Sequence, residues 1–168
     1  MKPLLVVDGY NVIGAWERAA KEGWSFEESR ERLATLLEEY AAFHGCEVVL
    51  VFDGTRSERL VRTHEQRGGV EIVFTRHGEI ADQYIERLCD GQPRFREVRV
   101  ATNDNVEQTV VLGRGATRLP ARELLREMAK ALAVQRDQIA RGPVKSGMLI
   151  SRLPQAQREA LEKMRRGE

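Results

Sequence analysis

The stretch LLVVDGYNVIGAW, residues 4–16, decides the fold of this 168-residue chain. Its first part, Leu4 to Val7, is apolar and partly β-branched, which is typical of a strand buried on both faces. Strands of this kind belong to parallel sheets that are covered by helices. The run ends directly in Asp8 and Gly9, so a carboxylate follows the strand at its carboxyl end.

Strands and helices alternate along the rest of the chain. Ser25 with Glu28 three residues later forms a capping box, and Gly45 provides a helix stop, so a helix is predicted between them. Pro120 is suited to open a second long helix. The remaining predicted elements are strands at 47–52, 70–75 and 97–102, helices at 79–89, 121–140 and 154–166, and loops after the first strand, before residue 70 and at 142–147.

This alternation predicts an α/β fold with a parallel sheet between two layers of helices. Ligands of such sheets bind outside the carboxyl ends of the strands, near the switch in strand order. Three predicted strands are followed there by an acid, namely Asp8, Asp53 and Asp104. Asp82 and Glu86 lie four residues apart on a predicted helix and share one of its faces.

Length, cysteines and charge limit the classes of protein. The chain fits one core, and no apolar run approaches the ~20 residues of a membrane span. Cys46 and Cys89 are isolated, which indicates buried free thiols and a reducing cytoplasm. Seven Lys and Arg against three Glu give residues 141–168 a charge of +4, so residues 1–140 carry −3 of the net +1. We therefore divide the chain into a domain at 1–140 and a basic loop and helix at 141–168, which permits nucleic-acid contact without establishing it.

Several common sites are disfavoured by the residues around the first strand. Gly9 and Gly14 have the spacing of a phosphate-binding loop, but Ala15 and Trp16 replace its Lys and Ser or Thr. A haloacid-dehalogenase-type phosphatase requires a second Asp at position 10, which is Tyr. The three scattered histidines give little support to a zinc site or a Ser–His triad.

The acids at the predicted sheet edge indicate a different chemistry. Carboxylates that converge raise one another's pKa unless a cation is present, and hard oxygen ligands select Mg²⁺ or Mn²⁺. Such an ion lowers the pKa of a bound water and stabilises the charge that develops on a phosphodiester. Asn11 adds an amide that can orient a carboxylate, a water or a phosphate. A structural alternative stays open, because Asp104 also suits a helix cap and Asp53 also suits a turn.

Four motifs in order, VVDGYNVIGAW, VFDG, ADQYIE and VATNDNVEQ, resemble the NYN domain of the PIN-like nuclease superfamily. The closest resemblance is to the YacP-like branch of bacterial ribosome-associated endoribonucleases. It extends through GRGATRLPARELLREM and the terminal KMRRG, so it covers nearly the whole chain. It implies a PIN-like (Rossmannoid) three-layer α/β/α fold with a central, mainly parallel sheet, a C-terminal helical extension and RNA cleavage. Its acidic site maps by motif onto Asp8, Asp82 and Asp104, with Asn11 close by, while Asn103 stands where Ser is common.

Together these observations predict a cytoplasmic endoribonuclease that uses Mg²⁺ or Mn²⁺, with Asp8, Asp82 and Asp104 as ligands. Asn11, Asp53 and Glu86 are the supporting residues. The resemblance implies mRNA on the ribosome as substrate. One alternative is a non-catalytic RNA- or ribosome-binding module whose acids are structural. Another is a small-molecule phosphohydrolase, which the missing phosphate-loop Lys disfavours.

Arginines and lysines near the predicted edge and in the tail are the candidates for RNA contacts. Arginine suits the phosphate backbone through bidentate hydrogen bonds, although Glu58 and Glu65 could pair with some of these side chains. Tyr10 is expected to pack beneath its loop, with base stacking as the alternative. No motif marks an oligomer interface. The candidate RNA-binding residues are Arg56, Arg59, Arg62, Arg114, Arg118, Lys163, Arg165 and Arg166.

Overall fold

The computed structural model describes the backbone of residues 1–54, 61–103 and 115–151, and side chains as far as residue 140. The chain forms two compact units, Met1–Ala131 and Leu132–Glu168. Of the described elements, the first unit contains the whole sheet and every helix except the part of α6 that follows Ala131. None of the described helices has an apolar stretch long enough to cross a membrane.

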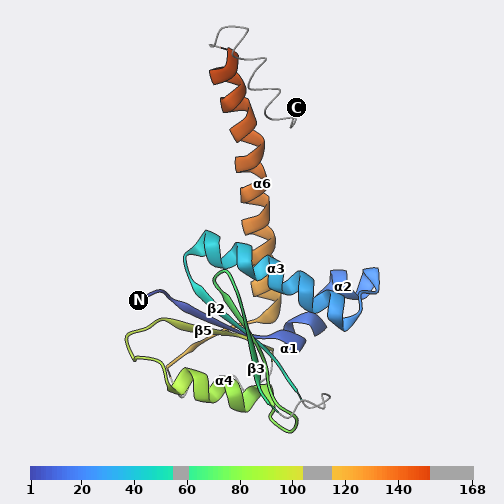
Figure 1. Ribbon diagram of the computed structural model, residues 1–168, viewed down its shortest axis with the longest axis vertical. Coiled ribbons are helices and arrows are strands. Elements are labelled where there is room, and N and C mark those ends of the chain that lie inside the picture. The colour runs from blue at the N-terminus through green and yellow to red at the C-terminus, as the bar shows by residue number, and fades with distance from the viewer. Residues whose placement is uncertain (55–60, 104–114, 152–168) are drawn as a thin grey trace. The chain divides into compact units, whose positions relative to one another are not determined.

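Six strands form one sheet in the order β3-β4-β2-β1-β5-β6. All neighbouring pairs are parallel except β3 and β4. Helix α3 lies on one face of the sheet and α4 on the other (Figure 1). The strands are β1 Leu4–Asp8, β2 Glu47–Phe52, β3 Thr63–Arg67, β4 Val70–Phe74, β5 Val98–Ala101 and β6 Thr117–Leu119, and the helices α1 Gly9–Gly14, α2 Glu17–Glu22, α3 Phe26–His44, α4 Ala81–Asp90 and α6 Ala121–Ser151. This confirms the predicted α/β class with helices on both faces.

The central strand β1 is buried along its whole length because both faces of the sheet are covered. Leu5 and Val7 belong to the cluster on the α3 side, while Leu4 and Val6 belong to the cluster on the α4 side. The two sets alternate along the strand, as the pleat requires. The continuous apolar run that opens the sequence is therefore the signature of a strand with two buried faces.

Local signals place the first long helix as predicted. Ser25 precedes α3, and its Oγ accepts a hydrogen bond from the Glu28 N–H at 3.1 Å. Gly45 ends the helix in the left-handed region at φ +62°, where a side chain would be strained. Both signals were readable from the sequence because capping acts over one turn of chain.

Two predicted loops contain regular structure. The segment after β1 forms the short helices α1 and α2, and the polar connection before β4 contains β3. Strand β3 was not predicted, because it is a polar edge strand whose first four residues are exposed. Its sequence therefore shows no apolar alternation. The three-residue strand β6 was also missed, since it is shorter than any window that shows a period.

The predicted loop at 142–147 is wrong, because α6 continues through it to Ser151. The loop was predicted from the run GPVKSG, whose proline lacks the N–H that an interior helix position normally donates. Its φ of about −65° is nonetheless compatible with a helix, so the helix can continue with one hydrogen bond fewer.

A polar cluster fastens the start of α6 within the first unit. The Tyr40 hydroxyl on α3 donates to Glu127 Oε2 at 2.6 Å and accepts from Arg99 Nη2 of β5 at 2.8 Å. Burial, with the Glu127 carboxylate beside it, raises the pKa of Tyr40 to about 12. Cys46 and Cys89 are buried free thiols, as predicted.

Candidate active site

Asp8 stands at the carboxyl end of the central strand. It pairs in register with Val51 of β2, and β5 lies on the opposite side of β1. The chain leaves β1 for β2 on one side and returns to β5 on the other, so Asp8 lies at the switch in strand order. Only 9% of Asp8 is exposed. The sheet therefore delivers a nearly buried carboxylate to the position where α/β folds bind ligands.

Asp53 connects this edge to helix α4. It follows β2 directly, and its Oδ2 accepts a hydrogen bond from the Ala81 N–H at 3.2 Å. That N–H is one of the groups left unsatisfied at the start of α4. Asp53 thus stabilises the start of α4, whereas the sequence suggested a turn for this residue and a helix cap for Asp104. Because Ala81 is held at the end of β2, the next residue, Asp82, belongs to the same edge as Asp8.

Asp82 and Glu86 occupy successive turns of α4. Both side chains are half-buried, whereas Ala81, Ile85 and Cys89 face the core. Four-residue spacing places the two carboxylates on one helix face, as predicted. Helix α4 therefore presents an acidic face at the sheet edge while its apolar face holds it against the strands.

Asn11 acts on the backbone that precedes Asp104. Its Oδ1 accepts a hydrogen bond from the Asn103 N–H at 2.7 Å. The side chain of Asn103 in turn accepts from the Ala121 N–H at 3.1 Å, at the start of α6. Asn11 and Asn103 thus connect the segment after β1, the exit of β5 and the first residue of α6. Asp104 itself lies outside the described residues.

Gly9 and Tyr10, which follow Asp8, pack against aromatic rings at the carboxyl edge of the sheet. A Cβ on Gly9 would lie 2.3 Å from Cε1 of Phe52, so this position has no room for a side chain. Glycine is needed here because the start of helix α1 lies close against the Phe52 ring. Tyr10 contacts the rings of Phe26 and Phe52, and its hydroxyl accepts from Arg30 Nη1 at 3.1 Å. This confirms packing as its role.

Glu79 is a charged residue that sequence reasoning missed. It is 5% exposed, and its carboxylate accepts hydrogen bonds from Arg62 and from Arg87, the latter at 2.6 Å. The pKa of Glu79 lies below its usual range, mainly because the Arg62 guanidinium donates to its carboxylate. Arg62 also lies over the Tyr84 ring, 4.8 Å from its centroid. No sequence pattern distinguishes Glu79 from an ordinary acid preceding a helix.

The remaining predicted residues are only partly described. Arg118 is half-buried in β6, and its Nε has no hydrogen-bond partner among the described residues. Within the described ranges no three His, Cys, Asp or Glu side chains form a metal-binding group, but the predicted trio includes Asp104 and stays a prediction. The two described members offer carboxylate oxygens, which fit Mg²⁺ or Mn²⁺. The residues that lie outside the described part are Asp104, Arg56, Arg59, Arg114, Lys163, Arg165 and Arg166.

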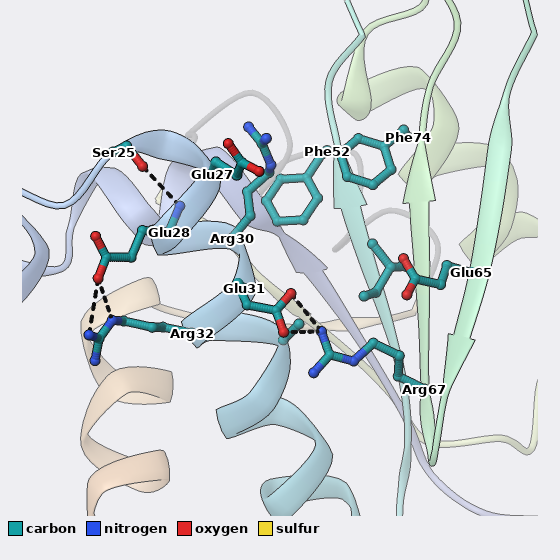
Figure 2. Close-up of a pocket in the computed structure, with 12 residues that line it drawn as sticks. Ser25, Glu27, Glu28, Arg30, Glu31, Arg32, Phe52, Glu65, Arg67 and Phe74 are labelled. Atoms are coloured by element: carbon teal, nitrogen blue, oxygen red, sulfur yellow. Dashed lines mark hydrogen bonds and ion pairs between the residues drawn. The ribbon is translucent and has the colours of Figure 1, made fainter.

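A groove of about 680 Å³ separates α3 from the outer strands of the sheet. Figure 2 shows the rings of Phe52 and Phe74 side by side at one end, with centroids 5.3 Å apart. Arg67 of β3 pairs across the groove with Glu31 at 3.0 Å. The charged groups along this groove largely neutralise one another, so it offers little attraction to a polyanion.

Comparison with known proteins supports the resemblance seen in the sequence. A family model for the YacP-like NYN domain matches residues 5–166. The uncharacterized protein YacP of Bacillus subtilis (strain 168) is 40% identical over 127 residues, which are 74% of each chain. Two crystal structures of Rae1 (YacP) from Bacillus subtilis each give a TM-score of 0.72. The first structure is 34% identical, and the match covers 99% of this chain and 96% of the Rae1 chain. The second, of a mutant, is 32% identical, and the match covers 96% of this chain and 99% of the Rae1 chain. The chain therefore has a PIN-like fold and belongs to the YacP-like NYN domain family of the PIN-like nuclease superfamily.

Proposed function

We propose that this protein is a metal-dependent endoribonuclease that hydrolyses phosphodiester bonds of mRNA in association with the ribosome, in the cytoplasm. The observation that carries the proposal is Asp8, a nearly buried carboxylate at the switch point of the sheet. Asp53 ties the helix that bears Asp82 to the same edge. Membership of a nuclease superfamily supports a phosphodiester as the bond attacked.

In this proposal Asp8, Asp82 and Asp104 hold Mg²⁺ or Mn²⁺. The chemistry that such an ion supplies is a bound water of lowered pKa and stabilisation of the charge on the phosphodiester. Asp8 brings its carboxylate on a rigid strand, so little reorganisation is needed on binding. Asn11 fixes the backbone at Asn103, one residue before the third ligand. Glu86, one turn after Asp82, extends the acidic face toward the helix end.

The test is metal-dependent cleavage of RNA by the wild type and by Asp8→Asn. We expect Mg²⁺ or Mn²⁺ to support cleavage by the wild type and none by the variant, measured on the same labelled RNA in gels. Thermal stability of the metal-free variant should hold or rise, because one of several mutually repelling charges is removed. The control is Asp90→Asn, an exposed acid at the far end of α4, which should cleave as the wild type does.

Equal cleavage by wild type and Asp8→Asn with Mg²⁺ present would refute the catalytic assignment. Failure of the wild type to cleave at any Mg²⁺ or Mn²⁺ concentration, with ribosomes supplied, would favour a non-catalytic RNA- or ribosome-binding module. Hydrolysis of a small phosphomonoester in place of RNA would favour a phosphohydrolase.

The basic tail supports the ribosomal part of the proposal through its charge of +4. Replacing Lys163, Arg165 and Arg166 together with Ala should weaken binding to ribosomes and long RNA. Each lost phosphate contact should remove roughly 0.7 from the log–log salt slope on a single strand. Cleavage of a short RNA at saturation should change little, since the acids are untouched. An unchanged salt slope in this triple variant would show that the tail is only a solvated surface. Arg56, Arg59 and Arg62 would then be the main candidates for RNA binding.

A further inference from the structure

A second hollow, of about 660 Å³, lies between helix α4 and the loop that follows β4. This loop leaves the carboxyl end of a parallel strand, so the hollow lies at the same edge of the sheet as Asp8. It is lined mostly by polar and charged residues, and two of them are exposed arginines. The lining residues are Arg76, His77, Gly78, Glu79, Gln83, Glu86 and Arg87.

The loop that forms one wall is fixed at both ends. Thr75 Oγ1 accepts a hydrogen bond from the Gly54 N–H at 2.7 Å and donates one to the Glu79 carbonyl at 2.7 Å. A Cβ on Gly54 would lie 1.9 Å from the Thr75 carbonyl oxygen, so the two backbones touch. Asp53 holds the other end through the Ala81 N–H. The wall is therefore pre-organised before any ligand arrives.

Glu79 places two arginines beside this wall. An isolated buried carboxylate is costly, but here Arg62 and Arg87 both donate to it. The trio carries a net charge of +1. Arg62 is braced against the Tyr84 ring, whereas the Arg87 side chain is 62% exposed. Arg87 is thus oriented by a buried partner while most of its surface remains open to a ligand.

The basic wall adjoins the acidic face of α4. Arg76 is exposed on the fixed loop, opposite Arg87 and the Gln83 amide. Glu86 lines the same hollow and stands one turn after Asp82. An anion that enters is therefore attracted by the two arginines and repelled by Glu86, which confines it to the arginine side.

We propose that Arg76 and Arg87 bind a backbone phosphate of single-stranded RNA next to the bond that is cleaved, and that Glu79 positions Arg87 for this contact. The inference rests on the proposed function, which supplies RNA as the substrate. Guanidinium groups bind phosphate oxygens bidentately and without regard to base sequence. The strand would then pass from the arginine wall to the acidic face of α4.

The test measures RNA binding separately from cleavage. All variants carry Asp8→Asn to block hydrolysis, and a fluorescein-labelled 12-nucleotide single strand is titrated by anisotropy between 50 and 200 mM KCl. The pair Arg76→Ala and Arg87→Ala should bind roughly tenfold or more weakly, with a salt slope reduced by about 0.7 for the one phosphate that both arginines contact. The control pair is Arg18→Ala and Arg32→Ala, which removes two exposed arginines from α2 and α3 and should leave both quantities unchanged.

Glu79→Gln tests the positioning role. If charge alone matters, removing a negative charge beside a polyanion strengthens RNA binding. We expect weaker binding instead, because Arg87 loses its ionic partner. Circular dichroism and thermal unfolding check the fold. If Glu79→Gln does not fold, Arg87→Lys replaces it, since Lys keeps the charge but loses the bidentate fork and should also bind more weakly.

Wild-type affinity and salt slope in the Arg76 and Arg87 double variant would overturn the inference and leave the proposed function intact. Tighter binding by a folded Glu79→Gln would overturn the positioning role. Loss of binding in the double variant, together with no cleavage by the wild type at any Mg²⁺ or Mn²⁺ concentration, would overturn the catalytic proposal and leave the phosphate site standing.

Discussion

Replacing Gly9 with Ala tests how Asp8 is held, because the new methyl group has no space. The Cβ would lie 2.3 Å from Cε1 and 2.5 Å from Cδ1 of Phe52, well inside van der Waals contact. Phe52 is 1% exposed, and its ring packs against those of Tyr10 and Phe74, with centroids 5.1 Å and 5.3 Å away. The ring therefore cannot move aside without disturbing its neighbours, so either it or the backbone next to Asp8 must shift.

The magnitude follows from two opposing effects. Overpacking a core costs typically 1–3 kcal/mol, and a contact this short lies at the upper end of that range. Ala gains about 1 kcal/mol over Gly in a helix, so Gly9→Ala should lose about 2 kcal/mol of unfolding free energy. Gly14→Ala is the matched control in α1, since its Cβ would meet nothing within 4 Å, and it should gain about 0.5–1 kcal/mol.

Urea unfolding followed by circular dichroism measures both variants, and Gly9→Ala should also unfold roughly 4–8 °C below the wild type. Phe52→Leu should cost less in the Gly9→Ala background than alone, because the smaller side chain admits the methyl group. RNA cleavage should fall with Gly9→Ala, since Asp8 is the adjacent residue. If Gly9→Ala and Gly14→Ala are equally stable, the reasoning on close approach is wrong.

Two further predictions concern residues around the site. The depressed pKa of Glu79 means that its contribution to stability is present above the ordinary Glu pKa of about 4.3 and is lost as pH falls through the lower folded value. Unfolding free energy measured from pH 6 to pH 3 should therefore fall less steeply in Glu79→Gln than in the wild type, and equal slopes would contradict this. Asn103→Ala removes the acceptor for the first N–H of α6 and should cost roughly 1 kcal/mol in urea unfolding. Unchanged stability in that variant would show that water replaces the side chain without loss.

The sequence predicted those parts of the fold that depend on local signals. The apolar run of β1, the Ser25 cap and the run that forms β2 each act within a few residues, so the pattern and the structure coincide. Strand β3 depends on pairing with β4, and β6 on pairing with β5. The residues of β3 are largely exposed and β6 has only three residues, so neither shows a period and only the assembled sheet defines them.

The candidate site divides in the same way. Asp8 and the Asp82–Glu86 pair were predictable, because strand ends and four-residue spacing fix where such side chains lie. The partners of Asp53 and Asn11 were not, since their hydrogen bonds join residues 28 and 92 positions apart. Glu79 was missed for the same reason, because its role depends on Arg62 from a different strand connection.

The strand order also has a consequence for the timing of folding during synthesis. Leu4 pairs with Glu47 on one side and with Val98 on the other, so the first strand made becomes the centre of the sheet only late. Contacts so distant along the chain slow folding, since long loops must close first. At about 5–20 residues per second, the roughly 50 residues from the end of β2 to the end of β5 take about 2.5–10 s to synthesise. Throughout that interval the edge of β1 that later pairs with β5 is unpaired. The surroundings of Asp8 are therefore incomplete until β5 has been made.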